Sequence, residues 1–530
     1  MLPPLLSLAS PHPLQPVAFK QCGPLHSIAT TQHIEQTAAP TLPPHTLMQR
    51  AGLAVAQLAC AIAPHARSVW LVCGPGNNGG DGLESAMHLQ HWGRNPVVTW
   101  LGDETHHPPD AKSSLMRARA AGVQFANAAP AQFDIAVDAL LGIGGGTRPL
   151  PQAMQTWLLH MHASPAPVLC IDVPSGLDAD TGCYFEPAFA TQLIAARAQS
   201  TALSGIYCLS LLTIKPGLFT AQGRDATGQV WWDDLAVTHA HAPTAWLLGD
   251  RPASPASPAS TASTASTAST DSVANTVQRS HASHKGSYGD VAVIGGAAGM
   301  TGAALLAARA ALHYGAGRVF VGLLDGSLTV DPTQPELMFR AVDTLDIQAS
   351  AVVCGCGGGD AVRAVLPRVL STAQRLVLDA DALNALATDP SLQTLLKQRA
   401  TRGQSTVLTP HPLEAARLLG CSAQAVQANR LKAAQQLADQ YHCTAVLKGS
   451  GTVIASFGQL ACINPTGNAR LATAGTGDVL AGMVGAQLAQ GGLAHQAACH
   501  AVYQHGLAAD RWPLHAALTA DALARFVHGS

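Results

Sequence analysis

A low-complexity stretch in the middle of the chain constrains its fold more than any other feature. Between Arg251 and Ser283 the sequence begins with PASPASPAS and TASTASTAST, which consist of small residues and proline. Such a stretch cannot bury enough apolar surface to offset the entropy cost of ordering it. The 530 residues also exceed what one hydrophobic core usually holds. The sequence therefore predicts two domains, residues 1–245 and 284–530, joined by a linker at 246–283.

Short apolar runs alternate with helical stretches in both halves. In the first half the runs are Ser68–Cys73, Asn95–Leu101, Phe133–Leu140 and Pro167–Val173. In the second half they are Asp290–Gly296, Arg318–Leu323, Ala351–Gly355, Arg375–Asp381 and Thr444–Gly449. Continuous apolar runs are typical of parallel strands that helices cover on both faces. We therefore expect two three-layer α/β/α domains, with ligands bound beyond the carboxyl ends of the strands.

Charge and composition exclude several classes of partner. A formal net charge of −2 provides no basic field that would favour nucleic acid or an anionic membrane. No apolar run is long enough to cross a bilayer, and the first twenty residues lack the basic start of a signal peptide. Twelve cysteines are scattered without the spacing of metal ligands or of a CxxC motif. We expect a cytoplasmic protein whose cysteines are reduced packing residues.

A loop rich in glycine and asparagine follows the first predicted strand. The segment GPGNNGGDG (74–82) contains the GxGxxG pattern of dinucleotide-binding loops, although an ordinary glycine-rich turn also satisfies so short a pattern. Asn77, Asn78 and Asp81 add amide and carboxylate groups to it. These groups can hydrogen-bond a ligand or coordinate a hard cation.

Two further strand ends in the first half carry an aspartate followed by glycines. Asp138 leads into LLGIGGGTR (140–148), and Asp172 opens DVPSGLD (172–178). A single aspartate at a strand end is most often a helix cap or a turn residue. Three such loops at neighbouring strand ends instead predict one shared site.

The first half resembles the epimerase domain of bifunctional NAD(P)H-hydrate repair enzymes. The resemblance rests on GPGNNGGDG, VDALLGIG and IDVPSGLDADTG and extends from about Pro43 to Val237. It implies a Rossmann-like fold and interconversion of the R and S forms of hydrated NADH and NADPH. It also implies that Asp138 is catalytic and that Asn78, Asp138 and Ser175 hold a potassium ion. The resemblance assigns hydrate binding to Asn77, Asn78, Gly79, Gly80, Asp81, Gly142, Ile143, Gly144, Gly145, Gly146, Thr147, Arg148 and Asp172.

The chain departs from the family pattern at two places in this half. Gln49 stands where glutamate is common, and the segment from Cys183 to Leu212 is longer, with an apparent insertion around Ile194–Tyr207. Lys215 is retained, but the sequence assigns it no role. A first domain that has become a regulatory ligand-binding module therefore remains an alternative to a working epimerase.

The strongest single motif lies in the second half. TAGTGDVLAG (473–482) opens a predicted helix that runs to about Gln490. Unpaired N–H groups at Gly475 to Gly477 and the helix dipole would together form an anion site. Asp478 either caps this helix or accepts a proton from a hydroxyl that attacks phosphorus. No Walker motif occurs, and the GTGD sequence resembles the ribokinase-like group instead.

The second half resembles the ADP- or ATP-dependent NAD(P)H-hydrate dehydratase domain, which has a ribokinase-like fold. The resemblance rests on HKGSYGDVAVIGG, LDADALNALA, VLTPHPLEAARLLG, VLKGSGTVIAS and NARLATAGTGDVLAGM, and covers His284 to about Trp512. It implies phosphorylation of the S hydrate, usually by ADP with AMP as product, followed by loss of phosphate. Mg²⁺ would accompany the nucleotide.

The same resemblance assigns residues to the two substrates of the dehydratase. Asp478 is the catalytic residue, and Ala303, Gly357, His411 and Asp478 face the hydrate. The nucleotide site consists of Lys448, Gly449, Ser450, Gly451, Thr452 and Gly477. Cys356 and Gly358 stand where the family commonly has proline and leucine. A small-molecule kinase with a non-catalytic first domain is the alternative function, and a homo-oligomer is compatible with either. The sequence does not decide between ADP and ATP or between the NADH and NADPH hydrates.

Overall fold

A computed structural model of the chain describes residues 14–18, 22–103, 105–145, 149–199, 205–250, 281–282 and 284–527. The chain divides into two compact units, the first formed by Met1–Ala18 and Pro24–Thr244 and the second by Phe19–Gly23 and Ala245–Ser530. The boundary between Gly23 and Pro24 falls inside the short strand β2 (Gly23–Leu25).

The predicted linker at 246–283 lies mostly outside the described part of the chain. Its residues 251–280 and 283 lie outside the described residues. Trp246 and Leu247, however, belong to strand β10 (Ala245–Leu247), which pairs with β19 (Cys462–Ile463) in the second unit. The apolar segment AWLL directly precedes the low-complexity stretch, and its burial against a strand distant in sequence was not evident from composition.

The first unit is built on a mostly parallel sheet. Its described strands are, in spatial order, β1 (Gln15–Pro16), β9 (Gln229–Asp233), β8 (Ile206–Leu211), β7 (Val168–Ile171), β6 (Ile135–Ala139), β3 (Ser68–Cys73), β4 (Asn95–Trp100) and β5 (Gln124–Phe125). Only β1 runs antiparallel to its neighbour. The chain winds outward from β3 to β5 and then from β6 to β9 in the other direction. The carboxyl ends of β3 and β6 therefore flank the point where strand order reverses, which is where such sheets bind ligands.

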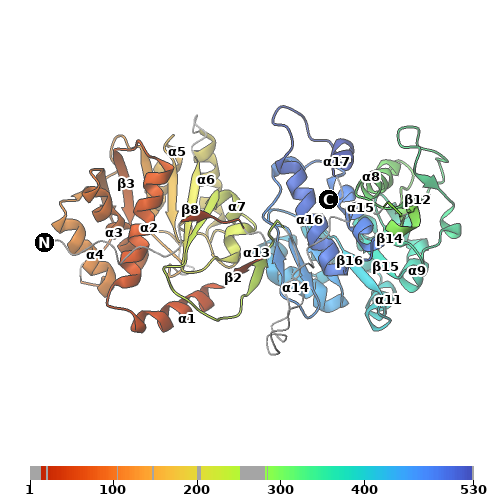
Figure 1. Cartoon of the computed structure of the whole chain (residues 1–530), viewed down its shortest axis with the longest axis horizontal. Helices are drawn as coiled ribbons and strands as arrows, with labels where there is room; N and C mark the ends of the chain where they lie inside the picture. The colour runs from red at the N-terminus through yellow and green to blue at the C-terminus, as the bar shows by residue number, and fades with distance from the viewer. Residues whose placement is uncertain are drawn as a thin grey trace. The chain divides into compact units, whose positions relative to one another are not determined.

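Helices cover both faces of this sheet (Figure 1). On one side α2 packs against α3 and α3 against α4, and on the other α5 packs against α6. The segment Cys183–Leu212 contributes helix α6 and strand β8 to the fold, with residues 200–204 outside the described ones. These layers confirm the predicted Rossmann-like α/β/α architecture. The described helices are α1 (Ile28–Ala38), α2 (Thr46–Ile62), α3 (Asn77–His91), α4 (Pro109–Ala120), α5 (Gln152–Ala163), α6 (Pro187–Gln199) and α7 (Gly223–Thr227).

The second unit has a larger sheet of the same general kind. Its described strands are, in spatial order, β13 (Met338–Phe339), β12 (Arg318–Leu323), β11 (Asp290–Gly295), β14 (Ala351–Cys354), β15 (Arg375–Leu378), β16 (Ser405–Leu408), β17 (Thr444–Leu447), β18 (Val453–Ser456), β19 and β10. Strands β13 to β17 are parallel, and β18 is antiparallel to both neighbours. The strand order reverses between β11 and β14, so the second unit also offers a ligand crevice at the carboxyl ends.

Alternate side chains of β11 enter two separate cores, one on each face of the sheet. Val291 and Val293 pack with α8, α15, α16 and α17, whereas Ala292 and Ile294 pack with helices α9 to α14. The described helices are α8 (Thr301–His313), α9 (Val362–Thr372), α10 (Ala380–Thr388), α11 (Pro390–Thr401), α12 (Pro412–Leu419), α13 (Ala423–Ala428), α14 (Arg430–Tyr441), α15 (Thr476–Ala489), α16 (Ala494–Asp510) and α17 (Ala520–Phe526). Among the described residues, the structure contains no helix with the length and hydropathy needed to traverse a bilayer.

Candidate functional sites

A pocket of about 960 Å³ opens beyond the carboxyl ends of β3 and β6 in the first unit. It brings together most of the residues that the sequence assigned to hydrate binding: Asn77, Asn78, Asp81, Gly142, Ile143, Gly144, Gly145 and Asp172. Sequence reasoning missed Glu35, His45 and Asp110, which also line it. Gly79 and Gly80 lie in α3 behind the lining residues, and Gly146, Thr147 and Arg148 lie outside the described residues.

The segment from Asn77 to Gly82 forms the first turns of α3, not an extended loop. Glycine is required at Gly79 because any side chain there would collide with the backbone of Gly74. This close approach holds the helix start, and the polar residues on it, directly above the end of β3. The buried Nδ2 of Asn78 has no hydrogen-bond partner within the described part of the chain. An unsatisfied buried amide of this kind indicates a group that bonds a ligand.

Asp172 anchors the opposite wall of this pocket. Its backbone is left-handed, with φ of 67°, a conformation that is uncommon for a residue other than glycine. Its carboxylate accepts hydrogen bonds from the ammonium group of the fully buried Lys215 and from the Ile143 N–H, the latter at 3.2 Å. Lys215 also donates to the Leu211 carbonyl at 2.7 Å. The lysine that the sequence left without a role therefore fixes a buried ion pair at the site.

Other carboxyl groups in the pocket favour their protonated forms. Burial, followed by the nearby Asp172 charge, raises the pKa of Asp81 well above its ordinary value. The same two causes raise the pKa of Glu35. The pocket thus contains two carboxyl groups with raised pKa values, Asp81 and Glu35, and an aspartate that is paired to a lysine. Such a combination is suited to acid–base chemistry.

Asp138 and Ser175 lie together beneath the pocket and not among the residues that line it. Asp138 is buried and accepts hydrogen bonds from Ser175 Oγ at 2.6 Å and Ser175 N at 2.9 Å. Burial raises the pKa of Asp138, and the bonds from Ser175 oppose this effect. In turn the Leu141 N–H donates to Ser175 Oγ at 2.9 Å. Asp138 therefore positions the loop that carries Gly142.

The GTGD segment of the second unit opens α15 as the sequence predicts. Gly475 immediately precedes the helix with φ of 90°, a conformation that favours glycine. Thr476 Oγ1 donates to the Leu471 carbonyl at 2.8 Å, and His505 Nε2 lies 3.0 Å from the Thr476 carbonyl oxygen. Gly477 and Asp478 are half-buried in front of these contacts. The first-turn N–H groups, which lack acceptors within a helix, are thereby held in place at an accessible surface.

Lys448 brings a positive charge to the first turn of α15. Its Nζ donates to Asp379 Oδ1 at 2.7 Å, and a methyl group added at Gly477 would lie 3.3 Å from that Nζ. Burial alone lowers the pKa of Lys448, but the charges of Asp379 and Glu414 outweigh burial and raise it. A charged ammonium group beside free helix amides forms a strong site for phosphate oxygens.

Residues 448–452, which the sequence assigned to the nucleotide, form the turn of a hairpin between β17 and β18. The buried Arg430 supports this turn from behind, because its guanidinium donates to the carbonyl oxygens of Leu447 and Lys448 at 3.1 Å each. Sequence reasoning did not single out Arg430. Its two hydrogen bonds hold the end of β17 and the start of the turn in place.

The carboxyl group of Asp478 has a raised pKa. Burial, followed by the charge of Asp379, raises its pKa to about 6. A hydrogen bond with the Cys356 thiol opposes this rise. Cys356 precedes Gly357, which abuts Ala303 so closely that an added methyl would lie 2.9 Å from its Cβ. The structure therefore places Gly357 and Ala303 together, next to the cysteine that contacts Asp478.

His411 forms the N-cap of α12. Its Nδ1 accepts from the N–H groups of Leu413 at 3.1 Å and Glu414 at 3.3 Å, and its own N–H donates to Glu414 Oε2 at 2.8 Å. The side chain remains 47% exposed, and its Nε2 lies 3.3 Å from Glu414 Oε1. Burial raises the pKa of the neighbouring Glu414 to about 7. The ring thus has a structural role and also faces solvent at the carboxyl edge of the sheet.

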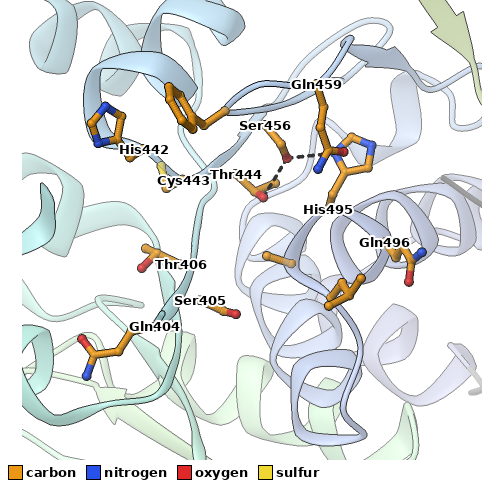
Figure 2. A pocket seen from close by; sticks show the side chains of 13 residues that line it. Gln404, Ser405, Thr406, His442, Cys443, Thr444, Ser456, Gln459, His495 and Gln496 are labelled. Carbon is orange, nitrogen blue, oxygen red and sulfur yellow. Dashed lines mark hydrogen bonds between the residues drawn. The ribbon is translucent and has the colours of Figure 1, made fainter. Parts of the chain in front are cut away.

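A second pocket, of about 330 Å³, lies at the opposite edge of the same sheet. Its walls include Ser405 and Thr444, the first residues of β16 and β17, together with Ser456 and His495 (Figure 2). None of the residues that the sequence assigned to a substrate lines this pocket. It is therefore separate from the phosphate chemistry at the carboxyl ends.

Comparisons with known proteins identify both units. The family model for the YjeF-related protein N-terminus matches residues 44–202, and that for NAD(P)H-hydrate dehydratase matches residues 291–527. The bifunctional NAD(P)H-hydrate repair enzyme of Escherichia coli is 35% identical over 482 residues, which cover 88% of this chain and 85% of that protein. The chain belongs to the family of bifunctional NAD(P)H-hydrate repair enzymes.

Further similar proteins include a second bifunctional enzyme and two dehydratases. The repair enzyme of Moorella thermoacetica is 32% identical over 546 residues and covers 93% of this chain and 92% of its own length. The ADP-dependent (S)-NAD(P)H-hydrate dehydratase of Neisseria meningitidis is 45% identical over 229 residues, which cover 42% of this chain and 76% of that protein. A crystal structure of the ADP/ATP-dependent NAD(P)H-hydrate dehydratase of Bacillus subtilis covers 47% of this chain and 91% of its own, at 32% identity and a TM-score of 0.41.

This repair enzyme is therefore bifunctional. Its first unit is an NAD(P)H-hydrate epimerase, and its second is an ADP-dependent (S)-NAD(P)H-hydrate dehydratase. The function predicted from the sequence is confirmed. The alternative of a small-molecule kinase has less support, because relatives that cover 88% and 93% of this chain are bifunctional NAD(P)H-hydrate repair enzymes.

Proposed function

We propose that Asp478 accepts the proton of the hydrate hydroxyl as that hydroxyl attacks the terminal phosphorus of ADP. The bond from phosphorus to the bridging oxygen of ADP breaks, AMP leaves with that oxygen, and a phosphate ester forms on the hydrate. The first-turn amides of α15 and the Lys448 ammonium group would stabilise the charge on the transferring phosphoryl group. A pKa of about 6 leaves Asp478 ionised at neutral pH, as a general base requires.

Loss of phosphate then completes the repair. The ring nitrogen supplies an electron pair, the bond from carbon to the ester oxygen breaks, and phosphate leaves with the bonding electrons. Loss of a proton from the adjacent ring carbon restores the reduced nicotinamide. Phosphorylation makes this step possible because phosphate is a far better leaving group than hydroxide.

The remaining assignments in the second unit are those that the resemblance to the dehydratase domain implies. Lys448, Gly449, Ser450, Gly451, Thr452 and Gly477 would hold the nucleotide. Ala303, Gly357 and His411 would face the hydrate. Mg²⁺ would arrive with ADP or ATP and neutralise charge on the phosphate oxygens, since it binds mainly through phosphates and water.

In the first unit we propose acid-catalysed exchange of the hydroxyl group. Asp81, whose pKa is raised, would protonate the leaving hydroxyl as the carbon–oxygen bond breaks with help from the ring nitrogen. Water would then add to the opposite face and return a proton to Asp81. The residues assigned to the hydrate at Asn77, Gly142 to Gly145 and Asp172 line the same pocket.

A potassium ion fits the oxygen atoms near this pocket. Asp138 is a buried carboxylate whose described hydrogen-bond donors, Ser175 and the Leu140 N–H, are neutral. Asn78 adds an amide oxygen close to Gly142, where an added methyl would lie 3.1 Å away. Asn78, Asp138 and Ser175 would hold the ion, which would neutralise the buried charge and order the Gly142 loop. We also propose that the protein is located in the cytoplasm and forms a homo-oligomer.

One observation supports the dehydratase mechanism most directly. The Lys448 ammonium group and the Asp478 carboxylate both lie beside Gly477 in the first turn of α15. The test is to incubate the purified S hydrate with ADP and quantify reduced cofactor, AMP and free phosphate. Hydrate repair predicts equal amounts of all three products. A phosphorylated organic product that accumulates without recovery of the reduced cofactor would favour a kinase instead.

A further inference from the structure

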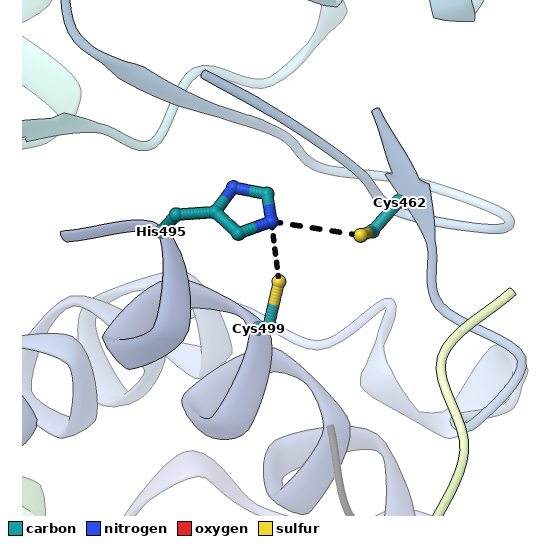
Figure 3. Close-up of side chains that lie close together, drawn as sticks. All are labelled: Cys462, His495 and Cys499. Atoms are coloured by element: carbon teal, nitrogen blue, oxygen red, sulfur yellow. Dashed lines mark hydrogen bonds between the residues drawn. The ribbon is translucent and has the colours of Figure 1, made fainter. Parts of the chain in front are cut away.

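A cluster of metal-ligand side chains lies outside both catalytic sites. Cys462 on β19 and His495 and Cys499 on α16 are buried together in the second unit (Figure 3). Their ligand atoms all lie within 4.8 Å of one another. The His495 Nε2 lies 3.6 Å from Cys462 Sγ and 3.5 Å from Cys499 Sγ.

These separations match a tetrahedral zinc site. Zinc binds imidazole nitrogen at about 2.0–2.1 Å and thiolate sulfur at about 2.3 Å, so tetrahedral geometry places the two ligand atoms about 3.5 Å apart. The spacing of His495 and Cys499, four residues apart on one helix, directs both side chains to the same face. The cluster therefore needs little rearrangement to surround an ion.

A chain of hydroxyl groups orients the imidazole for this role. His495 Nδ1 lies 2.9 Å from Ser456 Oγ, which in turn lies 2.8 Å from Thr444 Oγ1 (Figure 2). Donation from Nδ1 to the serine leaves the Nε2 lone pair directed at the two sulfur atoms. Metal-binding histidines commonly have their other ring nitrogen held in this way.

Cys22 supplies a fourth candidate ligand. Its thiol hydrogen-bonds with the Cys462 thiol, and it lies close enough to His495 for an electrostatic interaction. Cys22 belongs to the second unit although it stands near the start of the sequence, and it packs against the core that includes Cys462 and Cys499. Three thiols and one imidazole form a frequent ligand set of structural zinc sites.

We propose that Cys22, Cys462, His495 and Cys499 bind one zinc ion as a closed structural site. The thiols would lose their protons to become zinc ligands, and four protein ligands leave no position open for substrate. The ion would fasten residue 22 to β19 and α16 within the second unit. Because the four ligands come from three distant parts of the chain, their sequence spacing suggested only packing cysteines.

The primary test is the metal content of the full-length protein expressed with zinc in the medium and exchanged into metal-free buffer. We expect about one zinc per chain by elemental analysis. Cys499→Ser and His495→Ala should each lower the zinc content at least about fivefold. Cys421→Ser removes an exposed cysteine of the same unit and serves as the matched control that retains zinc.

A second measurement uses the wild-type protein, so that the proposal can be tested even if the variants do not fold. Zinc removed with a chelator is replaced by Co²⁺, and bound cobalt should show intense thiolate-to-metal charge transfer, with a higher melting temperature than the metal-free protein. Cys22→Ser should release zinc faster to the chelator. The proposal is overturned if the wild-type protein binds neither metal, or if a disulfide joins Cys462 to Cys499. If Cys22→Ser releases zinc at the wild-type rate, Cys22 is not the fourth ligand.

Discussion

Replacement of Asp478 by asparagine separates its proposed chemistry from its contribution to folding. Asparagine has nearly the same volume and can still bond the Cys356 thiol, but it cannot take up a proton. Loss of a general base should lower the dehydratase turnover by about 10²- to 10⁴-fold. Wild-type turnover should fall about tenfold per pH unit below about 6, because only the ionised Asp478 is active. The residual activity of the variant should lack this inflection.

The same substitution should leave the protein as stable or more stable. A rise in pKa from 3.8 to about 6 corresponds to about 3 kcal/mol against the ionised form in the folded state. Since the folded pKa is raised, this penalty is absent below pH 3.8, grows as the pH rises, and is complete above about 6. Partial exposure of the carboxylate to solvent reduces its size. At pH 7.5 the free energy of unfolding of Asp478→Asn should therefore equal or exceed that of the wild type.

The assay follows recovery of the reduced nicotinamide absorbance from the S hydrate with saturating ADP, across a pH series. Epimerisation of the R hydrate by the same preparation is the internal control and should be unchanged. Turnover within about threefold of the wild type would refute the role of Asp478 as a general base. A lower free energy of unfolding for Asp478→Asn than for the wild type would show that the lost turnover comes at least partly from a less stable fold.

Three further substitutions test other parts of the account. Gly477→Ala adds a methyl 3.3 Å from Lys448 Nζ and should raise the KM for ADP about tenfold, or about 1.4 kcal/mol, while an unchanged KM would place the nucleotide elsewhere. Lys215→Met leaves the Asp172 carboxylate without its buried partner and should lower the free energy of unfolding of the first unit by about 3–5 kcal/mol in calorimetry. The wild-type epimerisation rate should be higher in potassium than in a bulky organic cation, and Asn78→Ala should abolish this difference. If the variant keeps the difference, Asn78 does not hold the ion.

Much of the architecture was predictable because buried parallel strands leave a simple pattern. The predicted run Asp290–Gly296 became β11 (Asp290–Gly295), and Ser68–Cys73 became β3 with the same bounds. Such strands are covered on both faces, so their sequences are continuously apolar and easy to recognise. Strand β16 was not among the predicted runs because its first two residues, Ser405 and Thr406, are polar and leave only two apolar residues.

The sites were predictable where function depends on backbone geometry after a strand, and not where it depends on long-range contacts. TAGTGD marks an open helix start, and the structure has α15 begin at Thr476. The ion pair of Lys215 with Asp172 and the contact of Cys356 with Asp478 join residues far apart in sequence. No local pattern encodes such pairs, so only the fold reveals which residue neutralises or restrains another.

The most direct test of a two-step repair enzyme is the fraction of a mixed hydrate pool that it returns to reduced cofactor. An equal mixture of R and S hydrates is incubated with excess ADP, and the final yield is measured for the wild type, Asp81→Asn and Asp478→Asn under conditions where spontaneous epimerisation is slow. Within the time that the wild type needs for full recovery, Asp81→Asn should recover only the S half and Asp478→Asn a negligible fraction. Recovery of only the S half by the wild-type protein would contradict a working epimerase in the first unit.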